Sequence, residues 1–240
     1  DEMYLKYEKD KSIPKSTIGA QELFMDLLKE RAETGRIYIM NIDHCNTHSS
    51  FKDRVYMSNL CQEITLPTDP IQHIDQEGEI ALCILSAINV GLINKRDELE
   101  PLCDLAVRAL DEIIDHQKYP INAAEISTKA RRSLGIGYIG LAHYLAKKGY
   151  RYDQKMAWRQ VDKLTEAFQY YLLKASKEVA QEKGKCDYFD KTKYSDGVLP
   201  IDTYKKEVDE IVNRNLTYDW EWLRKEIKEH GLRHSTLTAQ

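Results

Sequence analysis

The sequence predicts an α/β protein that is weighted to helix in its second half. Up to about residue 90, short runs of branched and aromatic apolar residues, which are typical of strands, alternate with helical spacings. After about residue 97, apolar residues recur at helical spacing over long stretches that stop at glycine or before proline. Alternation of these two patterns is typical of folds in which helices cover a sheet.

Helix and strand patterns alternate in the first part of the chain. Residues 20–34 have helical spacing and are followed by Gly35, which suits the left-handed end of a helix. The run of branched and aromatic residues directly after it predicts a strand over residues 36–42. Two further strands are expected over residues 58–66 and 79–90, the second of them apolar enough to be buried on both faces.

Helices dominate the second part. Asp97 is expected to cap a helix that ends before Pro120. Residues 123–148 are expected to form a second helix, and a long amphipathic helix is expected from Asp153 to the glycine at Gly184. Two shorter helices are expected over about residues 200–212 and 217–230, the second ending at Gly231.

Composition and charge exclude several classes of protein. The chain has 240 residues, of which 42% are hydrophobic and 31% charged, an ordinary composition for a soluble globular protein. No apolar run approaches the roughly 20 residues that a bilayer span needs, and the start is not a signal peptide, so we expect no membrane. A net charge of −4 gives no long-range attraction for nucleic acid. Five scattered cysteines without a CxxC pair fit a cytoplasmic protein with free thiols.

The organisation along the chain indicates one continuous domain, because no repeat, proline-rich linker or long charge block interrupts it. The chain starts at Asp1 and stops in a strand-like run, LRHSTLTAQ. We therefore expect a segment of a longer polypeptide.

Gly135, Gly137 and Gly140 match the glycine pattern of a dinucleotide-binding loop. That loop needs a strand before the first glycine, whereas the preceding ISTKARRSL is charged and helical in spacing. We therefore favour a structural interpretation, in which the glycines let a helix pack closely or bend, and we do not assign a nicotinamide site.

Several other polar or reactive groups have structural interpretations that we favour. The run Asp43-His44-Cys45-Asn46-Thr47-His48 contains zinc-ligand types, but a polar turn explains it better, and we assign no metal site. Arg131-Arg132 with Lys129 are explained equally well by a phosphate site and by a solvated helix face. Cys103 and Cys186 are interpreted as incidental thiols, and Tyr170-Tyr171 as packing residues.

The motif Asn59-Leu60-Cys61-Gln62-Glu63 combines different chemical groups. In an extended segment, residues i, i+2 and i+4 point to one face, so an amide, a thiol and a carboxylate would project together. These are a hydrogen-bonding group, a nucleophile or radical carrier, and a general base. By the residues alone, a half-exposed strand explains the motif as well, and Cys83 in the apolar run LCIL is best explained as a buried structural cysteine.

Longer stretches give these residues a context. RIYIMNIDHCNTHS, SNLCQEITLPT, GEIALCILSAINVG, RRSLGIGYIGLAHYLAKKG, FQYYLLKASKE, LPIDTYKK and HGLRHSTL resemble the large catalytic subunit of aerobic class I ribonucleoside-diphosphate reductase, in the right order over nearly the whole chain. The resemblance implies that residues 1–240 are a central segment of that subunit's ten-stranded α/β barrel, without the N-terminal effector-binding region and the C-terminal segment.

The resemblance also implies residue roles. Cys61 matches the cysteine that becomes a thiyl radical, Glu63 the carboxylate that takes the proton of the substrate 3′-hydroxyl, and Asn59 the amide that hydrogen-bonds the substrate. Residues 59–63 together match the substrate-binding motif. Cys83 matches one of two redox-active thiols, whose partner belongs to an earlier strand outside this sequence.

The implied partners follow from the same family. They are the N- and C-terminal segments of the subunit, a small radical-generating subunit with a di-iron or related metal centre, and a ribonucleoside diphosphate substrate. Thioredoxin or glutaredoxin would be the external reductant, nucleotide effectors would bind elsewhere, and this segment would bind no cofactor. We expect the segment alone to be inactive. The alternatives are a non-catalytic interaction module derived from the reductase and, with less support, a cysteine hydrolase using Cys61, for which no histidine partner is evident near the motif.

Overall fold

A computed structural model describes residues 2–73, 77–82, 84–212 and 215–238. Contacts divide the chain into two compact units, residues 1–40 and 41–240. Cys83 lies outside the described residues. No helix among the described residues is long and apolar enough to cross a membrane.

The first unit contains helices α1, Glu2–Lys9, and α2, Ala20–Thr34. The prediction for α2 is confirmed, including its end: Gly35 has φ 65° and donates its backbone N–H to Arg31 O. Neither helix has a buried residue, and apolar side chains such as Leu23 and Phe24 are more than half exposed.

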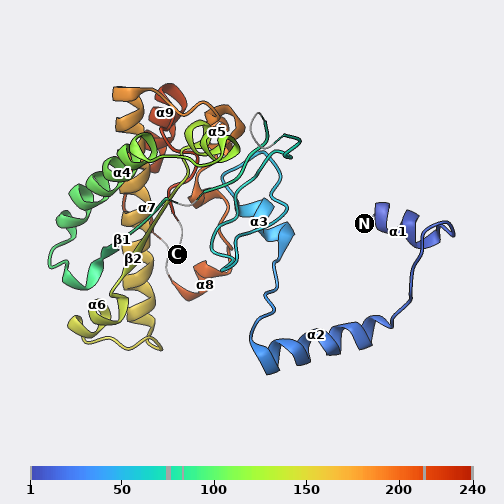
Figure 1. The fold of residues 1–240 in the computed structure, drawn as a ribbon. Coiled ribbons are helices and arrows are strands. Elements are labelled where there is room, and N and C mark those ends of the chain that lie inside the picture. The colour runs from blue at the N-terminus through green and yellow to red at the C-terminus, as the bar shows by residue number, and fades with distance from the viewer. Residues whose placement is uncertain (1, 74–76, 83, 213–214, 239–240) are drawn as a thin grey trace. The chain divides into compact units, whose positions relative to one another are not determined.

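The second unit is drawn in Figure 1. Its helices, strands and short 3₁₀ turns (η) are, in chain order, α3 Ile42–His48, β1 Ile84–Asn89, η1 Val90–Leu92, η2 Arg96–Glu98, α4 Leu99–His116, α5 Asn122–Arg131, β2 Leu134–Ile139, α6 Leu141–Lys147, α7 Lys155–Lys183, η3 Phe189–Lys191, η4 Lys193–Asp196, η5 Pro200–Asp202, α8 Val208–Ile211 and α9 Trp220–His230.

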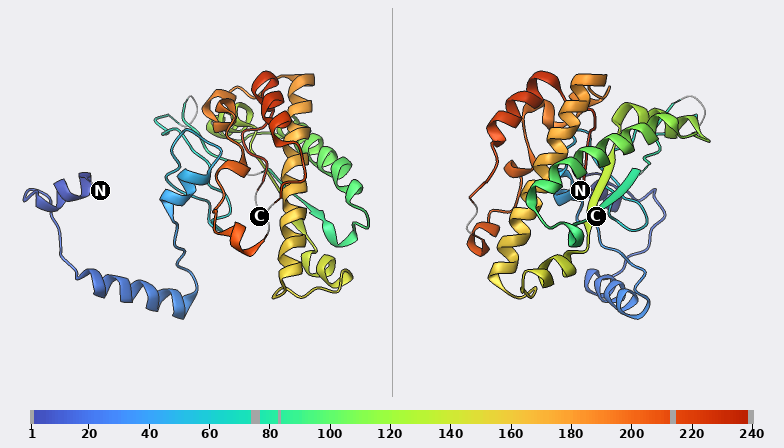
Figure 2. Two further views of the ribbon diagram at one scale, coloured as in Figure 1. Left: turned by 180° about the vertical axis from the view of Figure 1, so that it is seen from behind. Right: turned by 90° about the vertical axis from the view of Figure 1, so that its left-hand side faces the viewer.

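Strands β1 and β2 are parallel, in register from Ile84 opposite Leu134 to Asn89 opposite Ile139. Helices α4 and α5 form the crossover between them, and Figure 2 shows the two strands side by side. The C-terminal segment lies along β2: Leu134 N donates to Thr236 O at 3.0 Å and Ile136 N to Leu237 O at 2.8 Å. This confirms the mixed α/β class, with β1 and β2 as the strands assigned among the described residues; the closed ten-stranded barrel stays a proposal.

The core lies where α4 packs against β1 and the long helix α7. Cys103 and Val107 of α4 and Leu172 and Val179 of α7 are buried in it. The amphipathic character predicted for α7 is therefore confirmed, whereas α4 also carries an exposed leucine, Leu105, which is 64% exposed. Helix α7 is followed by Gly184, and α9 by Gly231, as expected from the sequence.

Three expectations in the first half are wrong. Residues 36–41 form no strand, and the supposed polar turn 43–48 lies within helix α3. Residues 58–66 form no strand either. Asn59 closes a turn there, with its backbone O accepting from Gln62 N and its side-chain Oδ1 accepting from Ile64 N. An asparagine side chain that bonds nearby backbone competes with the ladder of a sheet.

The second half differs at three places. The helix expected over 123–148 is interrupted, because Arg132 adopts a left-handed conformation, φ 47°, and the glycine-rich run that follows forms β2. Residues 200–212 contain only η5 and the four-residue α8. Glu98, not Asp97, occupies the N-cap of α4, because the preceding residues form a 3₁₀ turn.

Candidate functional site

The segment with the amide, thiol and carboxylate is a turn. Gln62 has φ 61°, and Cys61 and Leu60 are exposed, Leu60 to 85%. The turn brings the two ends of the motif together: Asn59 Nδ2 donates to Glu63 Oε1 at 2.6 Å. The amide and carboxylate therefore meet as expected, although by a turn and not by the pleat of a strand, and Cys61 does not join them.

Glu63 also lines a cavity of about 240 Å³. Its other carboxylate oxygen, Oε2, is buried and has no hydrogen-bond partner among the described residues. Leaving a buried carboxylate oxygen without a hydrogen bond costs free energy. Such an oxygen therefore indicates a place where a ligand can donate a hydrogen bond. The cavity walls come from widely separated parts of the chain: His48, Ser49, Ser50, Phe51, Ile64, Thr65, Leu66, Leu82, Ser133, Leu134, Gly135, Gln169, Tyr194, Pro200, Thr236 and Thr238.

Most of these cavity residues were not predicted as site residues. His48 ends α3, Ser133 precedes β2, and Gln169 lies on α7. The hydroxyl-rich runs around Ser49-Ser50 and Thr236 are visible in the sequence, but nothing local indicates that they meet. Gly135, which we expected in a helix, lies in β2 and lines the cavity.

Asn59 lines a second cavity of about 450 Å³, together with Glu79 and a mainly apolar wall. Within the described part of the chain, neither cavity is lined by Leu60, Cys61 or Gln62. Asn59 and Glu63 are thus the predicted residues that the structure brings together, and they lie at two adjoining cavities.

Arg131 connects the loop that carries this site to helix α5. Its guanidinium is almost fully buried, bonds Glu79 Oε2 and Asp53 Oδ2 at 3.0 Å each, and lies 5.0 Å from the Tyr188 ring centroid. Arg131 Nη1 and Glu79 Oε1 have no partner among the described residues. Both interpretations of Arg131, a phosphate site and a solvated face, are therefore wrong, because the arginine is buried and pairs with two carboxylates of the chain itself.

Arg132 belongs to a second buried network, centred on Asp111. Arg132 Nε donates to Asp111 Oδ1 at 2.8 Å, and His234 Nε2 lies 3.2 Å from the same oxygen. Burial alone would raise the pKa of the Asp111 carboxyl, but the hydrogen bond from His234 and the charge of Arg132 outweigh burial and hold it below its ordinary range. Lys183 and Arg233 add positive charge at 3.2 and 3.3 Å.

The free cysteines among the described residues are Cys45, Cys61, Cys103 and Cys186. Burial raises the pKa of the Cys103 thiol and of the Cys186 thiol to about 12, so both stay protonated, in line with their expected incidental role. Tyr170 is buried among aromatic rings, stacked on Tyr218 at 4.7 Å between centroids, which confirms a packing role.

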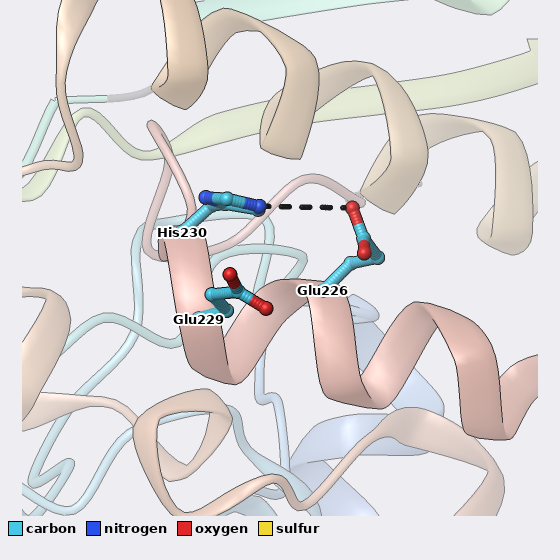
Figure 3. A group of neighbouring side chains, drawn as sticks. All are labelled: Glu226, Glu229 and His230. Atoms are coloured by element: carbon cyan, nitrogen blue, oxygen red, sulfur yellow. Dashed lines mark ion pairs between the residues drawn. The ribbon is translucent and has the colours of Figure 1, made fainter.

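One group of metal-ligand types occurs among the described residues, Glu226, Glu229 and His230 near the end of α9 (Figure 3). Their ligand atoms lie within 4.8 Å of one another. Glu226 already has two basic neighbours, His230 Nε2 at 3.8 Å and Lys177 Nζ at 3.5 Å. Ion pairing along a partly exposed helix therefore accounts for this group.

Comparison with known proteins covers the whole chain. The family described as "Ribonucleotide reductase, barrel domain" matches residues 1–240. The ribonucleoside-diphosphate reductase subunit alpha of Haemophilus influenzae is 58% identical over all of this chain, and ribonucleoside-diphosphate reductase 1 subunit alpha of Escherichia coli K12 is 57% identical. The subunit alpha of enterobacteria phage T4 is 41% identical over 99% of the chain. In each case the chain spans about a third, 32%, of the relative's length.

Proposed function

Because the chain belongs to the ribonucleotide reductase barrel-domain family, we propose that it is a central segment of a reductase catalytic subunit and carries its chemical centre. The reaction is the reduction of ribonucleoside diphosphates to 2′-deoxyribonucleoside diphosphates. The related subunits bear the name of this activity. The segment works only when the rest of the catalytic subunit completes the barrel around it.

In this proposal, the residues of the turn have different roles in the reaction. Cys61 carries the thiyl radical and removes the 3′-hydrogen atom of the ribose. Glu63 takes the proton of the 3′-hydroxyl, and Asn59 hydrogen-bonds the substrate. Water then leaves from C2′, and a dithiol that includes Cys83 supplies the two reducing equivalents and ends as a disulfide. Cys61 returns the hydrogen atom to C3′ and Glu63 returns the proton to the 3′-oxygen, so both residues are regenerated. Leu60 and Gln62 complete the substrate-binding motif.

The observation that supports this assignment most directly is the state of the Glu63 carboxylate. One oxygen accepts from Asn59 Nδ2, which orients the group. The other is buried beside a cavity lined by hydroxyl groups and has no partner in the described part of the chain. A general base needs an oriented carboxylate with one lone pair left for the substrate proton. The exposure of Cys61 fits a residue that must still be enclosed by other parts of the subunit.

The proposed partners follow from the family. They are the flanking segments of the catalytic subunit, a small subunit that generates the radical at a di-iron or related metal centre, and thioredoxin or glutaredoxin as reductant. The thiols of Cys45, Cys61, Cys103 and Cys186 are free, which suits the reducing cytoplasm where such a system would work.

Substitution of the radical cysteine tests the proposal. Cys61→Ser in the complete catalytic subunit, assayed with its small subunit, should abolish deoxyribonucleotide formation because a hydroxyl does not hold the radical readily. Cys45→Ser is the matched control, since Cys45 lies on α3 outside the motif. Turnover of more than a few per cent in Cys61→Ser would remove Cys61 from the mechanism. A complete assembly without reductase activity would favour an interaction module instead.

A further inference from the structure

The C-terminal segment, residues 232–238, is tied to the unit by backbone bonds on both sides. Cys186 N donates to Leu232 O at 3.0 Å, and Arg233 N donates to Ser176 O on α7 at 3.2 Å. Ser235 N donates to Arg131 O at the end of α5 at 3.0 Å. Together with the two hydrogen bonds from Leu134 and Ile136 of β2, these contacts fix the position of the segment along β2.

Resting on the proposed function, we propose that this segment is a wall of the substrate site. The Thr236 hydroxyl contacts the bound ribonucleotide, and His234 with Asp111 and Ser176 are positioning residues that hold Thr236 in place.

His234 is the central anchor. Its side chain is fully buried, with Nε2 3.2 Å from Asp111 Oδ1 and Nδ1 2.9 Å from Ser176 Oγ. Because an ionised carboxylate only accepts hydrogen bonds, Nε2 carries the proton and donates to Asp111. Burial lowers the pKa of His234 although Asp111 is close, so the ring is neutral. Nδ1 then accepts a hydrogen bond from the Ser176 hydroxyl. Both ring nitrogens are then satisfied, which leaves one orientation for the ring.

The resulting array has the residue types of a hydrolytic triad, but Asp111 pairs with Nε2 and Ser176 with Nδ1 of the ring, the reverse of a triad. Ser176 is fully buried on α7, and its Oγ also accepts the backbone N–H of His234 at 3.2 Å. Neither Ser176 nor His234 is among the residues that line the 240 Å³ cavity. With no access to substrate, the array can act only through the segment that it holds.

The anchor reaches the cavity through the next two residues. Ser235 Oγ lies 3.0 Å from Ser133 Oγ, and Ser50 Oγ donates to Ser235 O at 2.9 Å. Ser50, Ser133 and Thr236 all line the cavity that Glu63 lines. Thr236 is half-buried, and its hydroxyl makes no hydrogen bond within the described part of the chain. A hydroxyl that is fixed in place and has no partner among the described residues is suited to bind a polar ligand.

Four variants of the complete catalytic subunit test this inference, with substrate KM, kcat and melting temperature measured for each. Thr236→Val should raise KM roughly tenfold, the loss expected for one hydrogen bond to a ligand, with little change in melting temperature. His234→Leu should raise KM similarly through displacement of Thr236. His234→Asn, which restores a donor and an acceptor, should recover part of the loss. Ser176→Ala is the milder test if His234→Leu does not fold.

Glu166→Gln is the matched control for loss of a buried network. Glu166 is buried on α7 and accepts from Thr217 N and from Trp220 Nε1, and it does not line the cavity. This variant should lower the melting temperature without raising KM. The inference is overturned if Thr236→Val leaves KM unchanged, or if His234→Leu or Ser176→Ala raises KM no more than Glu166→Gln. A wild-type subunit without reductase activity would overturn the proposed function instead.

Discussion

Replacing Gly140 with alanine should destabilise the protein by about 2–4 kcal/mol more than the same change at Gly149. Gly140 immediately precedes α6 and has φ 79°. This left-handed conformation costs a residue with a Cβ about 1–2 kcal/mol. A Cβ placed there would lie 2.4 Å from Asn89 Oδ1 and 3.0 Å from Gly91 N. That oxygen accepts from Gly91 N at 3.1 Å, so the new methyl group must displace an existing hydrogen bond.

The magnitude follows from these contacts. Losing the Asn89–Gly91 bond costs about 1 kcal/mol, and forcing a methyl group into a filled space costs about 1–3 kcal/mol. Gly149 has nearly the same φ, 74°, but no described residue has an atom within 4 Å of its added Cβ, so Gly149→Ala includes the backbone cost alone. Both changes reduce the entropy of the unfolded chain equally. The difference between them therefore isolates the steric contribution.

Denaturant unfolding of the wild type and the two variants, followed by circular dichroism, measures the free energies of unfolding. A much lower midpoint for Gly140→Ala than for Gly149→Ala is expected. Equal losses would refute the reasoning, because they would show that the space beside Asn89 opens freely. A Gly140→Ala loss of the same size in an Asn89→Ala background would exclude displacement of the Asn89 side chain as its source.

The remaining predictions concern the carboxylate, the buried histidine and the thiols. Glu63→Gln keeps the shape of the side chain but removes the proton acceptor, so kcat of the complete reductase should fall by about 10²–10⁴ at nearly unchanged KM; an unchanged kcat would exclude Glu63 as the base. Because burial lowers the folded pKa of His234 below its ordinary 6.5, its contribution to stability is complete above that pH and is lost as the pH falls toward the folded value. Unfolding measured from pH 8 to 5 should show this loss, and His234→Asn should flatten it. A thiol reagent should modify exposed Cys61 quickly, whereas Cys103 and Cys186 should react only on unfolding; fast reaction of either buried thiol in the folded protein would contradict the described packing.

Elements with local signals can be predicted from the sequence alone. Helix α2 with its terminal Gly35, the stripe of the long helix α7 and the end of α9 at Gly231 all follow from spacing and capping. The family also follows from the sequence, because its motifs depend on residue order and not on contacts. The chemical roles implied for Asn59, Cys61 and Glu63 come from that same source.

Features that depend on distant partners became visible only in the folded chain. The run Leu134–Ile139 carries two glycines and no amphipathic alternation, and it becomes a strand because β1 and the C-terminal segment supply its backbone partners. Arg131 and Arg132 are adjacent charges that a sequence assigns to the surface, yet both pair with carboxylates from other parts of the chain in the interior. The cavity beside Glu63 likewise forms from residues as far apart as Ser50 and Thr236. Local propensity and spacing carry no information about such pairings, because their energy arises only when the separate segments pack together.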